Sequence, residues 1–347
     1  MTVDAPAVNR QVRLASRPVG LPTRENWSIV DAPMAEPAPG GVLVKTLMLS
    51  LDPAMRGWMN EGRSYIEPVG LGEVMRAGGV GRVVASNTPA FAVGDHVSGA
   101  LGVQQFCALD EAGLRKAGLV RIDPSLAPPE KWLNALGMPG MTAYFGLLEV
   151  GQFRAGESVL VSAAAGGVGS MVGQLARLRG AALVVGIAGS EAKCRWLVDE
   201  LGFDAAVNYR TEDVGARLAA LSPRGFDVFF DNVGGRILDT ALLHLAMHAR
   251  VVVCGWISVD YAGGAATGPA NYRQLLYKRA RIEGFVVFDY WQRYPQAQRQ
   301  LKQWYRAGSL RDCGHVFEGL EQMPLALQSL FTGANRGIVA CRVAPDP

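Results

Sequence analysis

Cysteine and histidine are scarce in this chain, and neither is grouped as a metal site or a disulfide framework requires. The five cysteines lie far apart and are odd in number: Cys107, Cys194, Cys254, Cys313 and Cys341. This excludes a disulfide scaffold and a zinc ribbon, and it favours a cytoplasmic chain with reduced thiols. The four histidines are His96, His244, His248 and His315, and none stands in a Gly-His-Glu context. His244 and His248 have the i, i+4 spacing of one helix face, but no acidic or thiolate partner is near in sequence. They indicate a partly buried helix pair rather than a metal site.

A strong excess of one charge is also lacking. The net charge is +3 and the pI is near 8.6, which argues against a nucleic-acid partner and is compatible with an anionic small ligand. With 49% hydrophobic and 19% charged residues, the 347-residue chain can bury the cores of about two domains.

Targeting and membrane segments are lacking as well. The segment 1–9 has no apolar block of the signal-peptide kind. One uncharged stretch, Ser158–Ala176, is long enough for a membrane span, but its middle, Gly166–Ser170, is a turn sequence. We therefore predict a buried strand, a turn and the start of a helix there.

The first third of the chain has the pattern of short strands. Candidate strands cover 40–50, 79–85 and 92–98, with a tight turn inside the last of these segments, and glycine and proline separate them. Short strands at this spacing predict a small antiparallel barrel.

Strands alternate with helical patterns after residues 124–129. The candidate strands are 158–162, 182–186, 226–230 and 250–254, and the first two precede helices at 169–179 and 191–201. Apolar strands between helices predict a parallel sheet covered on both faces. A helical pattern at 292–307 precedes strands at 315–317 and 337–343, so we expect the last segment to rejoin the first domain.

The main chemical signal is the segment Ala163–Gly169, which follows a strand and opens a helix. Aligned to G-x-G-x-x-G, it places Ala164, Gly166 and Gly169 at the three glycine positions. The second glycine lets the backbone approach a pyrophosphate, and the third lets the helix pack on the strand. Alanine at the first position requires an ordinary backbone conformation there. In this context the motif predicts a dinucleotide site at the helix N-terminus.

The cofactor is predicted from a missing acid. An NAD site holds the ribose hydroxyl with an acidic residue about 20 residues further on. Here that window, Val184–Ser190, has no acid, and Lys193 follows, with Tyr209 and Arg210 after the next strand. A cation near a 2′-phosphate favours NADP, and we assign Glu191 to the first helical turn.

The missing metal ligands also limit the chemistry. Without a metal, and without a tyrosine–x–x–x–lysine pair, the chain lacks the usual help for reducing a carbonyl group. We therefore expect the hydride to go to an easier acceptor, an activated C=C bond.

Several motifs, spread over nearly the whole chain, resemble those of the zinc-independent medium-chain dehydrogenases/reductases. The resemblance is closest to the branch of prostaglandin reductases (leukotriene B4 12-hydroxydehydrogenases), 2-alkenal reductases and curcumin reductases. Its marks are Leu51–Arg56, Gly137–Leu147, Ala163–Ser170, Asn208–Tyr209, Asp231–Gly235, Cys254–Gly255, Gly284–Val287 and Asn335–Gly337.

The resemblance implies an α/β fold with two domains. A GroES-like β-barrel domain that carries the substrate would cover 1–130 and be completed by 308–347. A Rossmann domain with a doubly wound parallel sheet would cover 131–307. It also implies homodimers.

The resemblance further implies the cofactor-binding residues. Lys193 and Tyr209 would contact the 2′-phosphate of NADP(H), and Phe285 and Asn335 would lie towards the nicotinamide. The remaining positions are Ala165, Gly166, Gly167, Val168, Gly169, Asn232, Cys254 and Val287. One departure is Ala54, where most relatives have a tyrosine near the substrate, so this chain leaves more room there.

The expected reaction is hydride transfer from NADPH to the β-carbon of an α,β-unsaturated ketone or aldehyde. Tyr277 matches the tyrosine proposed in relatives to donate a hydrogen bond to the substrate carbonyl, with a ribose hydroxyl as co-donor and solvent as the proton source. The residues alone equally allow a surface tyrosine in the basic segment Tyr277–Arg281, and the resemblance favours the first interpretation. Two alternatives are an NADPH:quinone oxidoreductase of the same superfamily and an NADPH-binding protein without turnover.

Overall fold

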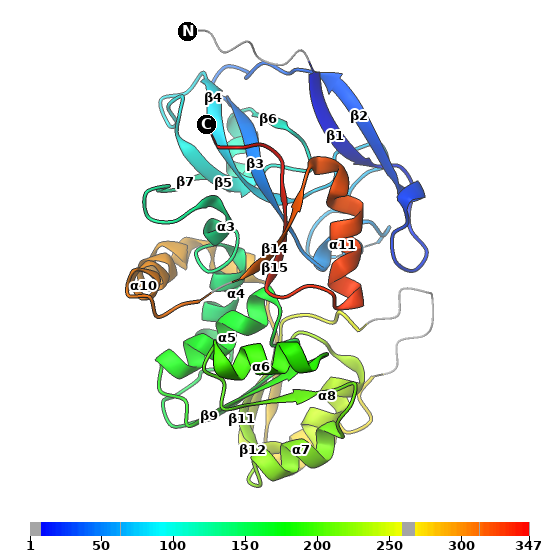
Figure 1. The fold of residues 1–347 in the computed structure, drawn as a ribbon, viewed down its shortest axis with the longest axis vertical. Coiled ribbons are helices and arrows are strands. Elements are labelled where there is room, and N and C mark those ends of the chain that lie inside the picture. Colours follow the sequence, from blue (N-terminus) through cyan, green and yellow to red (C-terminus); the bar gives the residue numbers. More distant parts are fainter. Residues whose placement is uncertain (1–7, 63, 259–267, 312, 347) are drawn as a thin grey trace. The chain divides into compact units, whose positions relative to one another are not determined.

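The structure is a computed structural model that describes residues 8–62, 64–258, 268–311 and 313–346 (Figure 1). The chain divides into two compact units, Met1–Leu133 with Gly314–Pro347, and Asn134–Cys313. The first unit has a mostly antiparallel sheet and the second a parallel one, so the predicted fold class is confirmed.

The first unit is built on a seven-stranded sheet in the order β14-β15-β3-β4-β5-β7, with β6 paired to β3. The C-terminal strand β15 is antiparallel to β3, with Cys341 opposite Leu49. A separate antiparallel pair, β1 and β2, lies outside this sheet. The strands are β1 (Val8–Leu14), β2 (Trp27–Pro33), β3 (Val42–Leu51), β4 (Gly78–Ser86), β5 (His96–Ala100), β6 (Phe106–Leu109), β7 (Val120–Arg121), β14 (Gly314–Glu318) and β15 (Ile338–Arg342). The helices are α1 (Ala54–Trp58), α2 (Glu111–Ala117), α3 (Pro129–Trp132) and α11 (Met323–Thr332), with 3-10 turns at Arg24–Asn26 and Leu320–Gln322.

The second unit is built on a six-stranded parallel sheet in the order β10-β9-β8-β11-β12-β13. This is the doubly wound order, in which the chain moves outwards from β8 first in one direction and then in the other. The strands are β8 (Ser158–Val161), β9 (Leu183–Ala188), β10 (Ala205–Asn208), β11 (Phe226–Asp231), β12 (Leu245–Val253) and β13 (Arg281–Gly284). The helices are α4 (Met138–Phe145), a π-helical turn (Gly146–Val150), α5 (Gly167–Leu178), α6 (Glu191–Asp199), α7 (Val214–Leu221), α8 (Gly235–Leu242), α9 (Gln274–Lys278), a 3-10 segment (Val287–Arg293) and α10 (Tyr294–Arg306).

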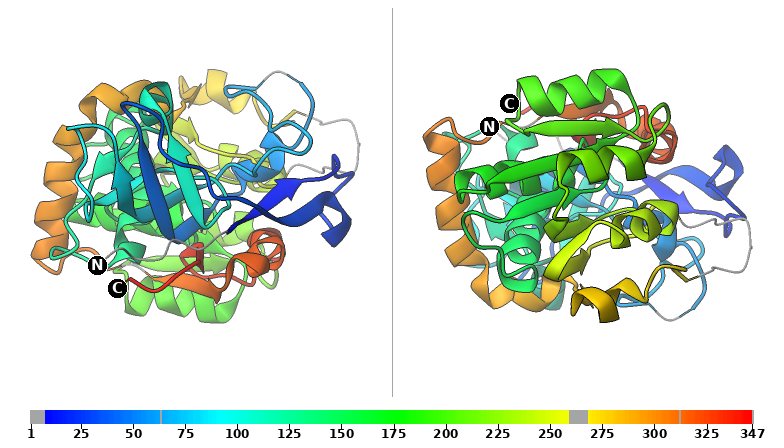
Figure 2. Two further views of the ribbon diagram at one scale, coloured as in Figure 1. Left: turned by 90° about the horizontal axis from the view of Figure 1, so that it is seen from above. Right: turned by 90° about the horizontal axis from the view of Figure 1, so that it is seen from below.

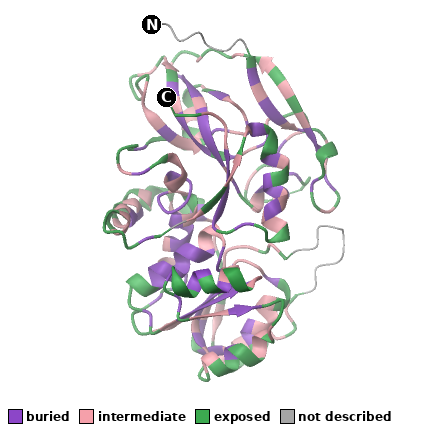
Figure 3. Cartoon of the chain, viewed as in Figure 1, coloured by how far each residue is buried: buried purple, intermediate pink, exposed green. Residues whose placement is uncertain are grey.

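Helices cover both faces of this parallel sheet (Figure 2). The central strands β8, β9 and β11 are buried along nearly their whole length, as Figure 3 shows. A strand covered on both faces has no solvent side, which explains its unbroken apolar sequence. The uncharged stretch Ser158–Ala176 forms β8, a turn and most of α5, as predicted. Among the helices of the described residues, none is both long enough and apolar enough to cross a membrane.

The prediction that His244 and His248 share a helix face is wrong. Helix α8 ends at Leu242, and His248 lies within strand β12 with a φ of 62°. Strand β12 bulges there, because Leu245 pairs with Phe226 and Arg250 with Val228, which leaves four residues of β12 opposite Asp227 alone. Pairing with the buried strand β11 therefore outweighs the helical spacing.

Candidate functional site

The glycine-rich turn after β8 is closely packed under the start of α5. A Cβ atom on Gly169 would lie 2.4 Å from the Ala163 carbonyl oxygen, so only glycine lets the helix approach the turn this closely. Gly166 precedes the first residue of α5 in an extended conformation. The first N–H groups of α5 have no partner inside the helix and point out of its N-terminus, where they can bind a phosphate.

The alanine in place of the first glycine has the ordinary backbone that we expected. Ala164 keeps a negative φ, whereas its neighbour Ala163 has a φ of 45°. The left-handed residue of this turn is therefore Ala163, a position for which no prediction was made from the sequence.

A buried polar network joins the ends of β8 and β11 beside this turn. The Ser162 hydroxyl donates to Asp231 (2.7 Å) and accepts from the backbone N–H of Asn232 (2.8 Å). The Asn232 amide donates to the Ser162 carbonyl oxygen (2.8 Å). The N–H groups of Val233 and Gly234 complete the shell of Asp231, which is fully buried. Burial raises the pKa of the Asp231 carboxyl, and the hydrogen bonds partly offset that rise.

Asn232 was predicted as a cofactor residue from the sequence, whereas the two residues that hold it, Ser162 and Asp231, were not. Their positions in the sequence gave one usable signal, because each stands at or just after the carboxyl end of a buried strand. The pairing itself joins residues 69 positions apart, which no local pattern reveals.

Lys193, Tyr209 and Arg210 gather beyond the carboxyl ends of β9 and β10. Lys193 lies in the first turn of α6, and its backbone N–H donates to the Ser190 hydroxyl that begins this helix (3.3 Å). Glu191 is also in that first turn, as we expected. The Arg210 guanidinium lies 5.8 Å from the centre of the Tyr209 ring. Burial lowers the pKa of the Lys193 ammonium, and the Arg210 charge lowers it further, so the two cations repel each other.

Gly189 makes room for Tyr209 in this group. A Cβ atom at Gly189 would lie 3.0 Å from the hydroxyl oxygen of Tyr209. Arg210 was not among the binding residues predicted from the sequence. A phosphate group beside Lys193 and Arg210 would replace their repulsion with attraction.

Phe285, which follows β13, is held by other aromatic rings. Its ring packs edge-on against Phe230 and against Tyr290, with 6.4 Å between the ring centres in both pairs. Tyr290 in turn stacks on Phe145 at 4.7 Å. A Cβ atom at Gly146 would lie 2.7 Å from the Phe285 ring, so glycine in the π-helical turn leaves the space that this ring needs. Val287, two residues further on, is buried.

The predicted cofactor residues of the second unit share one edge of the parallel sheet. One or more of them follows the carboxyl end of every strand: Ala165–Gly169 after β8, Lys193 after β9, Tyr209 after β10, Asn232 after β11, Cys254 after β12, and Phe285 and Val287 after β13. The Cys254 N–H donates to the Asp231 carbonyl oxygen (2.8 Å), which connects two of these turns. Ligands of open parallel sheets bind at this edge.

Three predicted residues lie elsewhere. Tyr277 is on α9, the helix that leads into the amino end of β13, and its side chain is exposed. Asn335 and Ala54 belong to the first unit. The buried Asn335 amide donates to the Gly337 carbonyl oxygen (3.1 Å), and the Ala54 N–H donates to Asp52 (2.7 Å).

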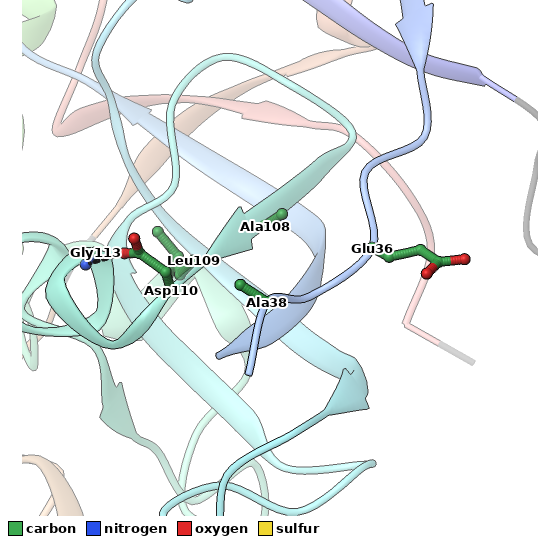
Figure 4. Close-up of a pocket in the computed structure, with 6 residues that line it drawn as sticks. All are labelled: Glu36, Ala38, Ala108, Leu109, Asp110 and Gly113. Carbon is green, nitrogen blue, oxygen red and sulfur yellow. Dashed lines mark hydrogen bonds between the residues drawn. The ribbon is translucent and has the colours of Figure 1, made fainter. Parts of the chain in front are cut away.

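Elsewhere in the described residues, a functional site could lie at a metal-binding cluster or at a surface pocket, and neither provides one. Within the described ranges, no three His, Cys, Asp or Glu side chains come together as metal ligands. One pocket lies on the first unit and includes none of the predicted residues (Figure 4). Asp110 there already accepts from the Gly113 N–H (2.6 Å) at the start of α2, and the carboxylate of Glu36 points away from it.

Two family descriptions match the chain. Residues 10–117 match the "N-terminal domain of oxidoreductase", and residues 167–303 match the "Zinc-binding dehydrogenase" family. The second name mentions zinc, although the described residues do not gather three candidate ligands.

Curated relatives and solved structures match nearly the whole chain. The NADPH-dependent curcumin reductase of Escherichia coli is 41% identical over 97% of this chain and 98% of its own. A 2-alkenal reductase (NADP⁺-dependent) of Nicotiana tabacum is 39% identical over 95% and 96%. The crystal structure of CurA from Vibrio vulnificus in complex with NADPH is 40% identical, with a TM-score of 0.90 over 97% of this chain and 100% of that one. A quinone oxidoreductase structure from Pseudomonas syringae is 25% identical, with a TM-score of 0.77 over 96% and 99%.

Proposed function

The chain belongs to the medium-chain dehydrogenase/reductase superfamily, in the branch of curcumin, 2-alkenal and prostaglandin reductases, and from this premise we propose that it reduces the C=C bond of α,β-unsaturated ketones or aldehydes with NADPH. The observation that carries the proposal is the second unit's carboxyl edge. At this edge, Gly169 lets the N-terminus of α5 lie close to the turn after β8. Lys193 and Arg210, whose positive charges repel each other, follow the neighbouring strands β9 and β10.

NADP(H) is the cofactor, and the residues at this edge fit it. The first turn of α5 would hold the pyrophosphate, and Gly169 provides the close approach of helix and turn. Lys193 and Arg210 would hold the 2′-phosphate, with the Tyr209 ring beside it. The remaining parts of the cofactor would be lined by Asn232, Cys254, Phe285, Val287 and Asn335. When bound, the nicotinamide supplies the hydride for the β-carbon of the substrate.

Tyr277 is the proposed donor to the substrate carbonyl oxygen. Negative charge develops on that oxygen as the β-carbon is reduced, and a hydrogen-bond donor that is already in place stabilises it. The Tyr277 hydroxyl can serve because, among the described residues, the only hydrogen bonds of Tyr277 are made by its backbone. The proton for the α-carbon comes from solvent in this proposal.

Ala54 bears on which substrates fit. Its methyl group stands at the start of α1, the position at which the resemblance implies a tyrosine ring in most members of the branch. We expect the missing ring to admit enones with bulkier substituents.

Quinone reduction is the second candidate function, because the Pseudomonas syringae quinone oxidoreductase shares the fold at 25% identity. The test is NADPH oxidation with benzylideneacetone, with an alkenal and with menadione, followed by mass analysis of the products. We expect a saturated ketone and a saturated aldehyde. Turnover with menadione alone would favour the quinone assignment, and no turnover with any acceptor would favour the non-catalytic alternative.

Cellular location and assembly complete the proposal. The five cysteines are free in the structure, and burial raises the pKa of the Cys341 thiol to about 12. Free, protonated thiols suit the reducing cytoplasm, where we place the protein. We also expect a homodimer.

A further inference from the structure

The turn that follows β13 carries two of the proposed cofactor residues, Phe285 and Val287, the first of them towards the nicotinamide. Phe285 is half-buried and Val287 is buried, although Gly284 before them and Phe288 after them are exposed. A short turn between exposed residues keeps a fixed position only where other parts of the chain hold it. The contacts that hold this turn therefore bear on where the nicotinamide lies.

The Phe285 ring is held partly by the π-helical turn Gly146–Val150. Gly146 has an ordinary right-handed helical backbone, so glycine is not needed there for conformation. A Cβ atom would lie 2.6 Å from the Phe230 ring and 2.7 Å from the Phe285 ring, so glycine is needed there for space. Single π-helical turns are rare, and many of them lie at functional sites. This one lets two aromatic rings approach the helix backbone.

The hydroxyl of Tyr294 holds the other end of the same turn. It donates to the carbonyl oxygen of Val287 (3.1 Å), with the Met138 sulfur at 3.9 Å. Burial raises the pKa of this hydroxyl to about 12, so it keeps its proton and remains a donor at neutral pH. Tyr294 is the first residue of α10, which packs against α4 (Figure 1). The hydrogen bond therefore ties the turn to the start of a packed helix.

Phe145 connects the two supports. Its ring stacks on Tyr290 at 4.7 Å and on Tyr294 at 5.9 Å between ring centres. Tyr290 in turn packs edge-on against Phe285. Phe145 is the last residue of α4 and directly precedes Gly146, so the stacked rings and the π-helical turn belong to the same stretch of chain. Both ends of the turn after β13 are thus connected to one point of α4.

Hydride transfer depends steeply on distance. The reacting atoms must approach to about 3–3.5 Å, and a displacement of about 1 Å can lower the rate about a hundredfold. We propose that Tyr294 is a positioning residue, whose hydroxyl fixes the turn 285–287 and thereby holds the nicotinamide at the distance that hydride transfer needs. The inference rests on the proposed function and adds a residue that acts through Val287.

Tyr294→Phe tests the inference, because it removes the hydroxyl and keeps the ring that stacks on Phe145. Stopped-flow mixing of the enzyme–NADPH complex with excess benzylideneacetone measures hydride transfer in a single turnover. We expect the rate constant to fall about tenfold to a hundredfold, while the amplitude and the Kd for NADPH stay within about twofold. A lower amplitude or a weaker NADPH affinity at an unchanged rate constant would indicate structural support or cofactor binding instead, and would overturn the inference.

Hydrogen exchange in the protein without cofactor gives a readout that does not depend on activity. We expect Tyr294→Phe to speed amide exchange in the segment 285–289 by about tenfold, and to leave exchange in β8 and β11 unchanged. Exchange at the wild-type rate in 285–289 would overturn the inference, since the hydroxyl would then not fix the turn.

Tyr305→Phe is the matched control. Residue 305 lies about 16 Å further along α10, and among the described residues the Tyr305 hydroxyl makes no hydrogen bond. This variant should keep the wild-type exchange and rate constant. The inference and the proposed function fail separately. A wild-type protein that reduces no enone would overturn the proposed function, whereas enone reduction by Tyr294→Phe at the wild-type rate constant would overturn the inference alone.

Discussion

The carboxyl edge of the parallel sheet and the outer edge of β13 differ in how far their charged side chains are buried and hydrogen-bonded. At the carboxyl edge, Asp231 is fully buried and its carboxylate is surrounded by donors from its own chain. At β13, Arg281 and Glu283 are about half exposed and share one 3.3 Å contact. The difference is one of burial: several hydrogen bonds fix the buried carboxylate at the carboxyl edge, whereas at β13 Arg281 donates to Val150 and Gln152 and Glu283 stays half exposed.

The largest expected effect is on the β13 side. Tyr277→Phe removes a single hydroxyl, and we expect kcat for an enone to fall by about tenfold to a thousandfold, because a donor to developing charge acts mainly in the transition state. NADPH affinity, measured by fluorescence, should stay nearly unchanged. Tyr272→Phe is the matched control on the same surface and should keep wild-type kcat. A Tyr277→Phe variant with wild-type kcat would remove this residue from the mechanism.

The next effect tests the buried side of the comparison. Asp231→Asn turns an amide group towards the donors that now surround the carboxylate, which costs about 1–3 kcal/mol in free energy of unfolding at neutral pH. NADPH binding should weaken with it, since Asn232 loses its support. Urea unfolding followed by circular dichroism measures the first change. An equally stable variant would mean that the network does not brace these turns.

The same substitution should alter the pH dependence of stability. Because burial raises the pKa of Asp231, the folded protein keeps this proton at pH values where the unfolded chain has lost it. The stability that this group contributes is therefore present below the ordinary pKa of aspartate and declines as the pH rises towards the raised value. Unfolding curves of wild type and Asp231→Asn over this interval should converge as the pH increases if the carboxyl group behaves in this way.

A smaller effect is expected at the partly buried Lys193. Lys193→Ala should raise the KM for NADPH by about tenfold to a hundredfold, because a charge-assisted bond to the 2′-phosphate is lost, and should change the KM for NADH little. Arg195→Ala, on the same helix, is the control. An equal loss with both cofactors would show that Lys193 supports the structure and does not distinguish the phosphate.

The smallest effect concerns metal. Prolonged dialysis against a strong chelator should leave enone reduction unchanged, and elemental analysis should find no stoichiometric zinc. The reason is that the described residues bring no three His, Cys, Asp or Glu side chains together as metal ligands. A tightly bound zinc ion whose removal abolishes activity would contradict the proposed mechanism.

Features encoded locally were predictable from the sequence. The turn before α5, the apolar strands around it and the first turn of α6 each depend on residues close together in the chain. The network of Ser162 and Asp231 was missed because it joins segments that are distant in sequence. His244 and His248 were placed on a helix because their spacing fits one, whereas pairing with β11 forms a bulged strand. The position of Tyr277 was missed because β13, with Arg281 and Glu283, lacks the apolar pattern of the central strands and was not expected to be a strand.

The place of β15 has a consequence for synthesis on the ribosome. Strand β15 pairs with β3, yet roughly 290 residues separate them, so at about 5–20 residues per second the first unit waits about 15–60 s for its partner strand. Until then part of β3 has an open edge that can pair with other chains. The second unit, whose strands all lie between these two segments, can complete its sheet earlier. We expect nascent chains that stop short of β15 to recruit chaperones, while their second unit already resists proteases.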